Sequence, residues 1–241
     1  MEICRKVNAD GTQNIANVCK KLDCKMVYIS TDYVFDGEGT RPWEPEDERH
    51  PLNVYGQTKY EGELAVQKTL EKYFIVRISW VFGVNGKNFI KTMLNLGKTH
   101  DHLTVVNDQF GSPTYTYDLA RLLVDMILTD KYGIYHATNE GICNWYEFAC
   151  EIFRVSDESQ ATGEQPHEQS QADRERIRKA SFLAGCVREI SERNPVNRFC
   201  VSRKITGNTS GSGIGNGTAP ILANVHHRAF KRDGVQSIQI E

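Results

Sequence analysis

Short apolar runs that alternate with helix-patterned segments constrain the first 154 residues more than any other feature. Runs of strand type lie at residues 25–30, 74–79, 103–106 and 134–137. Helical patterns cover residues 8–22, 53–72, 88–96, 117–128 and 144–154, the last with Asn144 as its N-cap. Strands that are apolar throughout and alternate with helices are typical of a parallel sheet covered on both faces. We therefore expect an α/β fold with a doubly wound, Rossmann-like sheet.

Residues 155–241 carry a different pattern. They hold three of the 23 aromatic residues, all of them Phe. One amphipathic helix is predicted at residues 173–193. The glycine-rich segment 207–217 lacks a third glycine at the spacing of a nucleotide-binding loop and follows no strand, so it is interpreted as a flexible linker. We expect a domain at residues 1–154 and a largely irregular tail at 155–241.

Composition excludes several classes of function. The net charge is -2, which gives no basic field for nucleic acid or an anionic membrane surface. No apolar stretch approaches the ~20 residues that span a bilayer, and the N-terminus has no signal-peptide core. Seven cysteines without a C-x-x-C pair favour a reduced, cytoplasmic setting over disulfides or a zinc site. We expect no metal, no nucleic acid and no membrane partner.

Three side chains suit the reduction of a ketone, which needs a hydride from a nicotinamide and a proton for the developing alkoxide. Thr31 follows the first predicted strand, at the sheet edge where ligands bind. Tyr55 and Lys59 are four residues apart and share a helix face. A nearby ammonium lowers the pKa of a phenol from ~10, and it can also donate to a dinucleotide ribose. Taken alone, the pair is equally well interpreted as a half-buried tyrosine and a solvated lysine.

The surrounding motifs carry a family resemblance. They are STDYVFDG at residues 30–37, PLNVYGQTK at 51–59, RISWVFG at 77–83 and NDQFGSPT at 107–114. Over residues 6–154 the chain resembles an extended short-chain dehydrogenase/reductase, and more narrowly the dTDP-4-dehydrorhamnose reductase family. The resemblance implies reduction of dTDP-4-dehydro-L-rhamnose to dTDP-L-rhamnose, in the biosynthesis of nucleotide sugars and cell-surface polysaccharides. It implies NADPH as the cofactor, with NADH as the alternative.

The resemblance also implies residue roles. The catalytic residues would be Thr31, Tyr55 and Lys59. The cofactor would contact Tyr55 and Lys59 together with Ser30 and Asn8. The dTDP-sugar would contact Asp32, Tyr33, Trp80, Asn88, Gln109 and Thr114, and segments of a smaller substrate domain would be interleaved after residue 80. Trp80 is equally well interpreted as a core residue, and the last three as helix caps or loop hydrogen-bonding groups.

The chain departs from the family at its start. The glycine-rich turn that opens the first helix of a Rossmann unit is missing before Thr31. The resemblance thus implies an N-terminal loss of roughly seventy residues, or two or three β-α units. A truncated or disrupted reading frame explains this departure and the unusual tail, and sequencing of the flanking DNA tests it.

Two other functions stay open. One is a non-catalytic binding or regulatory subunit, because the regulatory subunit of methionine adenosyltransferase resembles the same family. The other is an inactive fragment. A fluorescence titration with NADPH separates them from the enzyme, and the oligomeric state, a homodimer included, is open.

Overall fold

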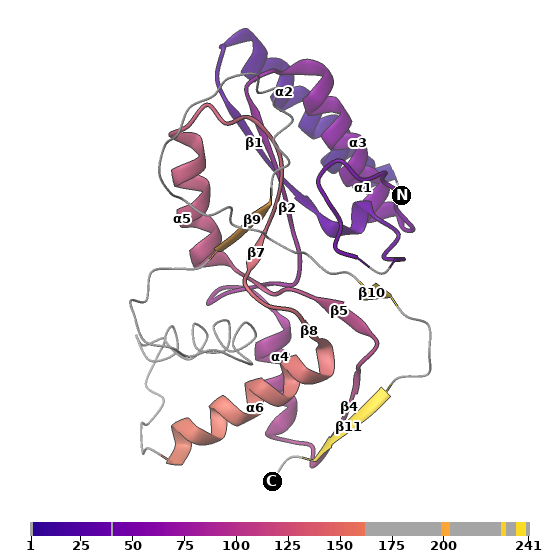
Figure 1. The fold of residues 1–241 in the computed structure, drawn as a ribbon, viewed down its shortest axis with the longest axis vertical. Helices are drawn as coiled ribbons and strands as arrows, with labels where there is room; N and C mark the ends of the chain where they lie inside the picture. Colours follow the sequence, from indigo (N-terminus) through magenta and orange to yellow (C-terminus); the bar gives the residue numbers. More distant parts are fainter. Residues whose placement is uncertain (1, 40, 162–198, 203–227, 230–234, 240–241) are drawn as a thin grey trace, which may run out of the picture.

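The computed structural model describes residues 2–39, 41–161, 199–202, 228–229 and 235–239. Figure 1 shows an upper lobe, built on a sheet with helices on both faces, and a lower lobe with two helices and short strands. We use these two names below. The expected α/β class is confirmed.

The sheet of the upper lobe has the order β1-β2-β7-β9. Strands β1 (Met26–Thr31), β2 (Tyr73–Ile78) and β7 (Gly133–Asn139) are parallel, and β9 (Phe199–Ser202) lies antiparallel to β7. The register places Ser30 of β1 beside Arg77 of β2, and Arg77 beside His136 of β7. The chain thereby brings three buried polar residues side by side in neighbouring strands.

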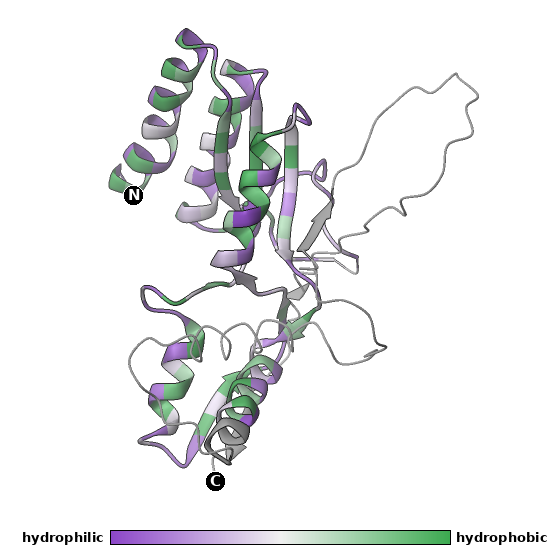
Figure 2. Cartoon of the chain, turned by 90° about the vertical axis from the view of Figure 1, so that its left-hand side faces the viewer, coloured by the Kyte–Doolittle hydropathy of each residue, from purple (hydrophilic) through white to green (hydrophobic). Residues whose placement is uncertain are grey.

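Helices cover both faces of this sheet. On one face, α3 (Val54–Thr69) packs against α2 (Gly11–Lys21), and α5 (Thr116–Ile127) covers the other face. Ala16, Met26, Tyr28, Val66, Leu70 and Ile75 form the core under α2 and α3. Phe74, Val76, Leu119, Met126, Tyr135 and Ala137 form the core under α5. Figure 2 colours the strands by the hydropathy of each residue, and the consecutive residues Ile75 and Val76 of β2 are both fully buried, which requires cover on both faces of the sheet.

The first helical segment begins before the predicted residue 8. α1 (Glu2–Arg5) runs into a π-helical turn, η1 (Lys6–Asp10), and then into α2. A π turn adds a residue to the helix and shifts the side chains that follow around the axis. This shift hides the helical period in residues 2–10, which is why the pattern predicted only the later part.

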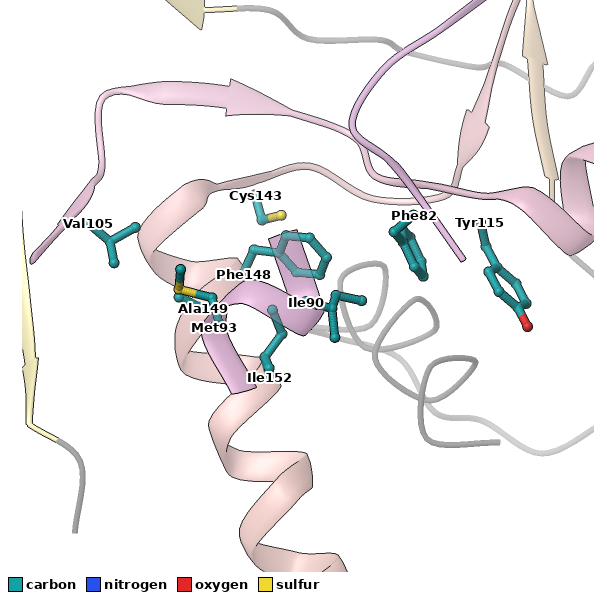
Figure 3. Close-up of a cluster of buried hydrophobic side chains, with 9 residues drawn as sticks. All are labelled: Phe82, Ile90, Met93, Val105, Tyr115, Cys143, Phe148, Ala149 and Ile152. Atoms are coloured by element: carbon teal, nitrogen blue, oxygen red, sulfur yellow. The ribbon is translucent and has the colours of Figure 1, made fainter. Parts of the chain in front are cut away.

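The lower lobe is assembled from segments that alternate with those of the upper lobe. Its elements are β3 (Val81–Phe82), α4 (Phe89–Gly97), β4 (His102–Val106), β5 (Gln109–Gly111), β6 (Thr114–Tyr115), β8 (Cys143–Asn144) and α6 (Trp145–Ala161). β10 (Arg228–Ala229) pairs with β5, and β11 (Val235–Gln239) pairs with β4. Its core, drawn in Figure 3, is formed by Phe82, Ile90, Met93, Val105, Tyr115, Cys143, Phe148, Ala149 and Ile152.

The tail differs in part from its predicted form. α6 runs to Ala161, seven residues beyond the expected boundary at 154, because no Gly or Pro interrupts the helix before residue 163. The strands β9, β10 and β11 add ordered pairing to a segment expected to be largely irregular. The predicted helix at 173–193 and the linker at 207–217 lie outside the described residues.

The helical stretch from α1 to α2 exposes several large apolar side chains, which are Ile3, Val7, Ile15, Val18 and Leu22. In the described part of the chain, β1 pairs with β2 alone and is an edge strand.

Within the described residues, no helix combines the length and the apolar character that a membrane span requires.

Candidate active site

Thr31 ends β1 and begins the 3-10 turn η2 (Asp32–Val34). Its hydroxyl accepts a hydrogen bond from the Tyr33 backbone N–H at 3.3 Å and donates to Asp32 Oδ1 at 3.0 Å. Thr31 is 5% exposed. The threonine thus caps the turn at the carboxyl end of a parallel strand, which is the edge where the sequence predicted a site.

The start of α3 is set by Asn53, whose Oδ1 accepts from the Gly56 N–H at 2.8 Å. The backbone at Gly56 lies against the Tyr33 carbonyl, where a Cβ atom would overlap it. This close approach brings Tyr55, in the first turn of α3, next to η2. The rings of Tyr55 and Tyr33 meet edge to face with centroids 6.0 Å apart.

Tyr55 is 47% exposed. Burial of the rest of the side chain raises the pKa of its phenol above the ordinary value, and the negative charge of Asp32 adds to the rise. The Thr31 hydroxyl, as a hydrogen-bonding partner of the phenol, lowers that pKa. Tyr33 links the two candidates, because its ring meets the Tyr55 ring and its backbone N–H donates to the Thr31 hydroxyl.

Lys59 lies one turn beyond Tyr55. Its Nζ donates to the Ile29 carbonyl at 2.6 Å and lies 4.0 Å from the centroid of the Tyr28 ring. Burial lowers the pKa of Lys59 to about 8, while the carboxylate of Glu63 opposes this shift. In this arrangement the Lys59 ammonium contacts Ile29 and Tyr28, and the raised pKa of Tyr55 is set by burial, Thr31 and Asp32.

The two further residues expected at the cofactor have structural partners. Ser30 is buried and its Oγ donates to Glu63 Oε1 at 2.6 Å, so the hydroxyl faces the interior. The Asn8 Nδ2 donates to Thr58 Oγ1 at 3.1 Å, and that hydroxyl donates to the Tyr55 carbonyl at 3.1 Å. Asn8 thus lies beside the first turns of α3, within the π turn η1.

The residues expected at the sugar divide between the lobes. Asp32, which is buried, and Tyr33, which is half exposed, lie with Thr31 at the sheet edge. Trp80 packs against the core of the lower lobe, Asn88 is the N-cap of α4, Thr114 lies in β6 and the exposed Gln109 lies in β5. The structure therefore brings only the first two directly to the catalytic candidates.

Three of these residues have clear partners in the fold. Trp80 stacks on Trp145 with ring centroids 3.6 Å apart, at a backbone φ of 47°. Asn88 caps α4, with its Oδ1 accepting from the Lys91 N–H at 3.1 Å. Thr114 is fully buried and donates to the Ser79 carbonyl at 2.6 Å. In the fold, Trp80 is thus a packing residue, Asn88 is a helix cap and Thr114 is a hydrogen-bonding group of a short strand. These are the interpretations that the sequence had left open.

The sequence analysis missed a fully buried ion pair beside the site, between Glu63 of α3 and Arg77 of β2. The spacing of four residues that groups Tyr55 with Lys59 also places Glu63 on the same helix face, and this signal was available in the sequence. His136 of β7, next to Arg77, was given no role. It is buried, and burial together with the Arg77 charge lowers its pKa to about 3.

The donor set fits one end of a nicotinamide dinucleotide. A half-exposed phenol and an ammonium on one helix face, beside a threonine hydroxyl at a strand end, suit a carbonyl oxygen and a ribose. No glycine-rich turn opens a helix in the described ranges, so they offer no counterpart for the pyrophosphate end. Nor does the described part of the chain gather three or more His, Cys, Asp or Glu side chains as a metal site would.

Comparison with known proteins places these residues in a family. The model of the family described as "RmlD substrate binding domain" matches residues 2–183, beyond the expected limit at 154. The Bacillus subtilis spore coat polysaccharide biosynthesis protein SpsK is 44% identical over 150 residues, which cover 62% of this chain and 53% of that protein. The Escherichia coli dTDP-4-dehydrorhamnose reductase is 41% identical over 157 residues, covering 63% and 52% respectively.

Solved structures of similar proteins agree with the fold. A dTDP-4-dehydrorhamnose reductase from Clostridium acetobutylicum is 50% identical with a TM-score of 0.63, over 65% of this chain and 55% of that one. The Bacillus anthracis enzyme, solved in complex with NADP, is 46% identical with a TM-score of 0.61, over 62% and 53%. The chain spans about half the length of the relatives that it matches.

Proposed function

The chain belongs to the RmlD substrate binding domain family, and we propose that it carries the catalytic residues of a dTDP-4-dehydrorhamnose reductase. The proposed reaction is the NADPH-dependent reduction of dTDP-4-dehydro-L-rhamnose to dTDP-L-rhamnose. The observation that supports it most is the packing of α3 on η2: the Tyr55 ring meets the Tyr33 ring, the Tyr33 N–H donates to the Thr31 hydroxyl, and Lys59 lies one helical turn from Tyr55. Named relatives that are reductases of this kind, one of them bound to NADP, support the choice of substrate and cofactor.

NADPH, when bound, supplies the hydride that goes to the C4 carbonyl carbon of the sugar. Tyr55 gives its phenolic proton to the carbonyl oxygen, so the ketone becomes a hydroxyl and the phenol a phenolate. Thr31 holds that oxygen beside the phenol through its own hydroxyl. Lys59 donates to the cofactor ribose and stabilises the phenolate, for which its Nζ must turn from the Ile29 carbonyl.

We propose that Asp32 and Tyr33 shape the pocket next to the carbonyl, because they follow Thr31 directly and Tyr33 packs on Tyr55. Trp80 and Gln109 are proposed to flank the nucleotide-sugar from the lower lobe. Asn88 and Thr114 would affect binding of the nucleotide-sugar indirectly, by fixing the backbone segments that their hydrogen bonds hold. Asn8 and Ser30 would likewise support the cofactor end from behind α3 and β1.

The compartment is part of the proposal. Five cysteines have free thiols: Cys4, Cys19, Cys24, Cys143 and Cys150. Free thiols support a reducing, cytoplasmic setting, where nucleotide sugars would be supplied.

The test is a turnover assay with the purified chain, NADPH and dTDP-4-dehydro-L-rhamnose, followed by loss of absorbance of the reduced cofactor. We expect oxidation of NADPH that needs the sugar and yields dTDP-L-rhamnose. A titration of NADPH fluorescence is run beside it. Binding with turnover supports the enzyme, whereas a cooperative melt without binding or turnover would contradict it and favour a non-catalytic subunit. Failure to melt cooperatively would favour an inactive fragment.

A further inference from the structure

The carboxylate of Glu63 is fully buried, and both of its oxygens accept hydrogen bonds. Glu63 is 0% exposed. Its Oε1 accepts from Ser30 Oγ at 2.6 Å and from Arg77 Nε at 2.8 Å, and its Oε2 accepts from Arg77 Nη2 at 2.7 Å. The remaining Arg77 Nη1 donates to the Pro45 carbonyl at 3.0 Å. Two parallel bonds between a guanidinium and a carboxylate allow only one relative placement of the two groups.

This network joins the segments that build the site. Glu63 lies on α3, Arg77 on β2 and Ser30 at the end of β1, while Pro45 belongs to the connection between η2 and α3. Ser30 immediately precedes Thr31. The hydrogen bond from Ser30 to Glu63 therefore fixes α3 to the residue next to the catalytic threonine.

The same helix face holds β1 at a second point. Lys59, one turn before Glu63, donates to the carbonyl of Ile29. Two neighbouring residues of β1, Ile29 and Ser30, are thus bonded to side chains spaced four residues apart on α3, which sets the register of the helix on the strand.

An ion pair is a costly way to fill this space. Removal of two charges from water is expensive, and apolar side chains of similar volume often stabilise a core at least as well. The ion pair contributes directionality. Its bidentate hydrogen bonds specify one position of α3 on the sheet, whereas apolar contacts allow the helix to slide. The charge has a second effect, since the Glu63 carboxylate raises the pKa of Lys59 against the lowering that burial causes. Besides Glu63, Lys59 faces the Tyr28 ring of β1.

We propose that Glu63 and Arg77 are positioning residues, which hold α3, and with it Tyr55 and Lys59, in register with the end of β1. The site that they position is the one of the proposed function, so the inference rests on that function. Its test does not need turnover, because the charge state of Lys59 can be measured directly.

The test compares Glu63→Gln with Glu61→Gln. Glu61 lies on the same helix and pairs with Arg5 at the surface, so its variant is matched in chemistry and differs in position. The titration of Lys59 is followed by the NMR shift of its Cε, assigned with Lys59→Arg. We expect the midpoint of Lys59 to fall by about one pH unit in Glu63→Gln. In Glu61→Gln we expect it to stay at the wild-type value.

A second variant covers the case in which Glu63→Gln does not fold. In Glu63→Leu/Arg77→Met, apolar side chains replace both charges, a change that cores often accept. The Lys59 midpoint is again expected below that of the wild type. Equal midpoints in the wild type and in every folded variant would overturn the proposal.

Turnover separates this inference from the proposed function. In an active wild type, the Glu63 variants should lower kcat at least tenfold with KM nearly unchanged, and Glu61→Gln should leave both unchanged. Normal kcat in the Glu63 variants would overturn the positioning role. Absence of turnover in the wild type would contradict the proposed function, while the Lys59 titration would still decide the positioning role.

Discussion

The backbone of Gly56 rests against the carbonyl oxygen of Tyr33, with no room for a Cβ atom between them. This contact presses the first turn of α3 onto η2 and so sets the distance between Tyr55 and Thr31. We predict that Gly56→Ala lowers stability by about 1–3 kcal/mol, because the helix must move away. Turnover should fall even where the variant stays folded, because a small misplacement of the reacting groups lowers the reaction rate strongly. Urea denaturation and the NADPH assay measure the two effects, and unchanged turnover in a folded variant would contradict this prediction.

Replacement of Tyr55 by Phe removes one hydroxyl from a half-exposed side chain. We expect the unfolding free energy to stay within about 0.5 kcal/mol of the wild type, as for most surface changes. Turnover is expected to fall by about 10²–10⁴-fold, the usual contribution of a general acid. Tyr117→Phe, an exposed tyrosine on α5, is the matched control and should keep full activity. Equal activity of the two variants would remove Tyr55 from the mechanism.

His136 makes stability depend on pH. It is 1% exposed, and its Nε2 has no hydrogen-bond partner in the described part of the chain. Because burial lowers its pKa to about 3, against ~6.5 in an unfolded chain, the unfolded state takes up a proton first as the pH falls. Stability due to the neutral imidazole is thus full above pH ~6.5 and declines by ~1.4 kcal/mol per pH unit below it.

The variant His136→Leu should lack this decline. Denaturant unfolding of the wild type and the variant between pH 7 and 4 is expected to give curves that converge as the pH falls. His50→Gln, at an exposed position, should follow the wild type throughout. Parallel curves for the wild type and His136→Leu would show that His136 does not titrate as described.

The stacked pair of Trp80 and Trp145 depends on a glycine. A Cβ atom at Gly111 would lie 2.6 Å from Cε2 of Trp80. The Trp80 ring also stacks on Trp145. We predict that Gly111→Ala costs about 1–3 kcal/mol and weakens the circular dichroism of the coupled indoles. Gly11→Ala is the control, because Gly11 has a helical φ of -59° and a Cβ atom there would make only a van der Waals contact of 3.4 Å with the Lys6 carbonyl oxygen. It should gain about 0.5–1 kcal/mol, and a gain in both variants would contradict the predicted clash.

Local patterns were enough to predict the main elements of the upper lobe. β1 and β2 appear in the sequence as short apolar runs, and Thr31 and Tyr55 follow from a strand end and a capped helix start. The two- and three-residue strands of the lower lobe, such as β3 and β6, could not be predicted, because they are too short to show a period.

The direction of polar side chains was also beyond the sequence. Ser30 looks available at a strand end, yet it turns inward to a carboxylate that Arg77 holds from the next strand. Lys59 shares a face with Tyr55, yet its ammonium finds a nearer acceptor in Ile29. Both outcomes depend on partners brought in by strand register, which spacing along one segment does not contain.

Thr31 and Lys59 delimit one uninterrupted strand–loop–helix unit, in which all three catalytic candidates lie. The entropic cost of closing the loop of residues 35–53 grows only slowly with its length, so these groups can come together before more distant segments arrive. The same continuity has a weakness. A protease that cuts the exposed chain after Arg41 would place Thr31 and Tyr55 on separate fragments. Assembly of the site would then depend on the concentration of the two fragments.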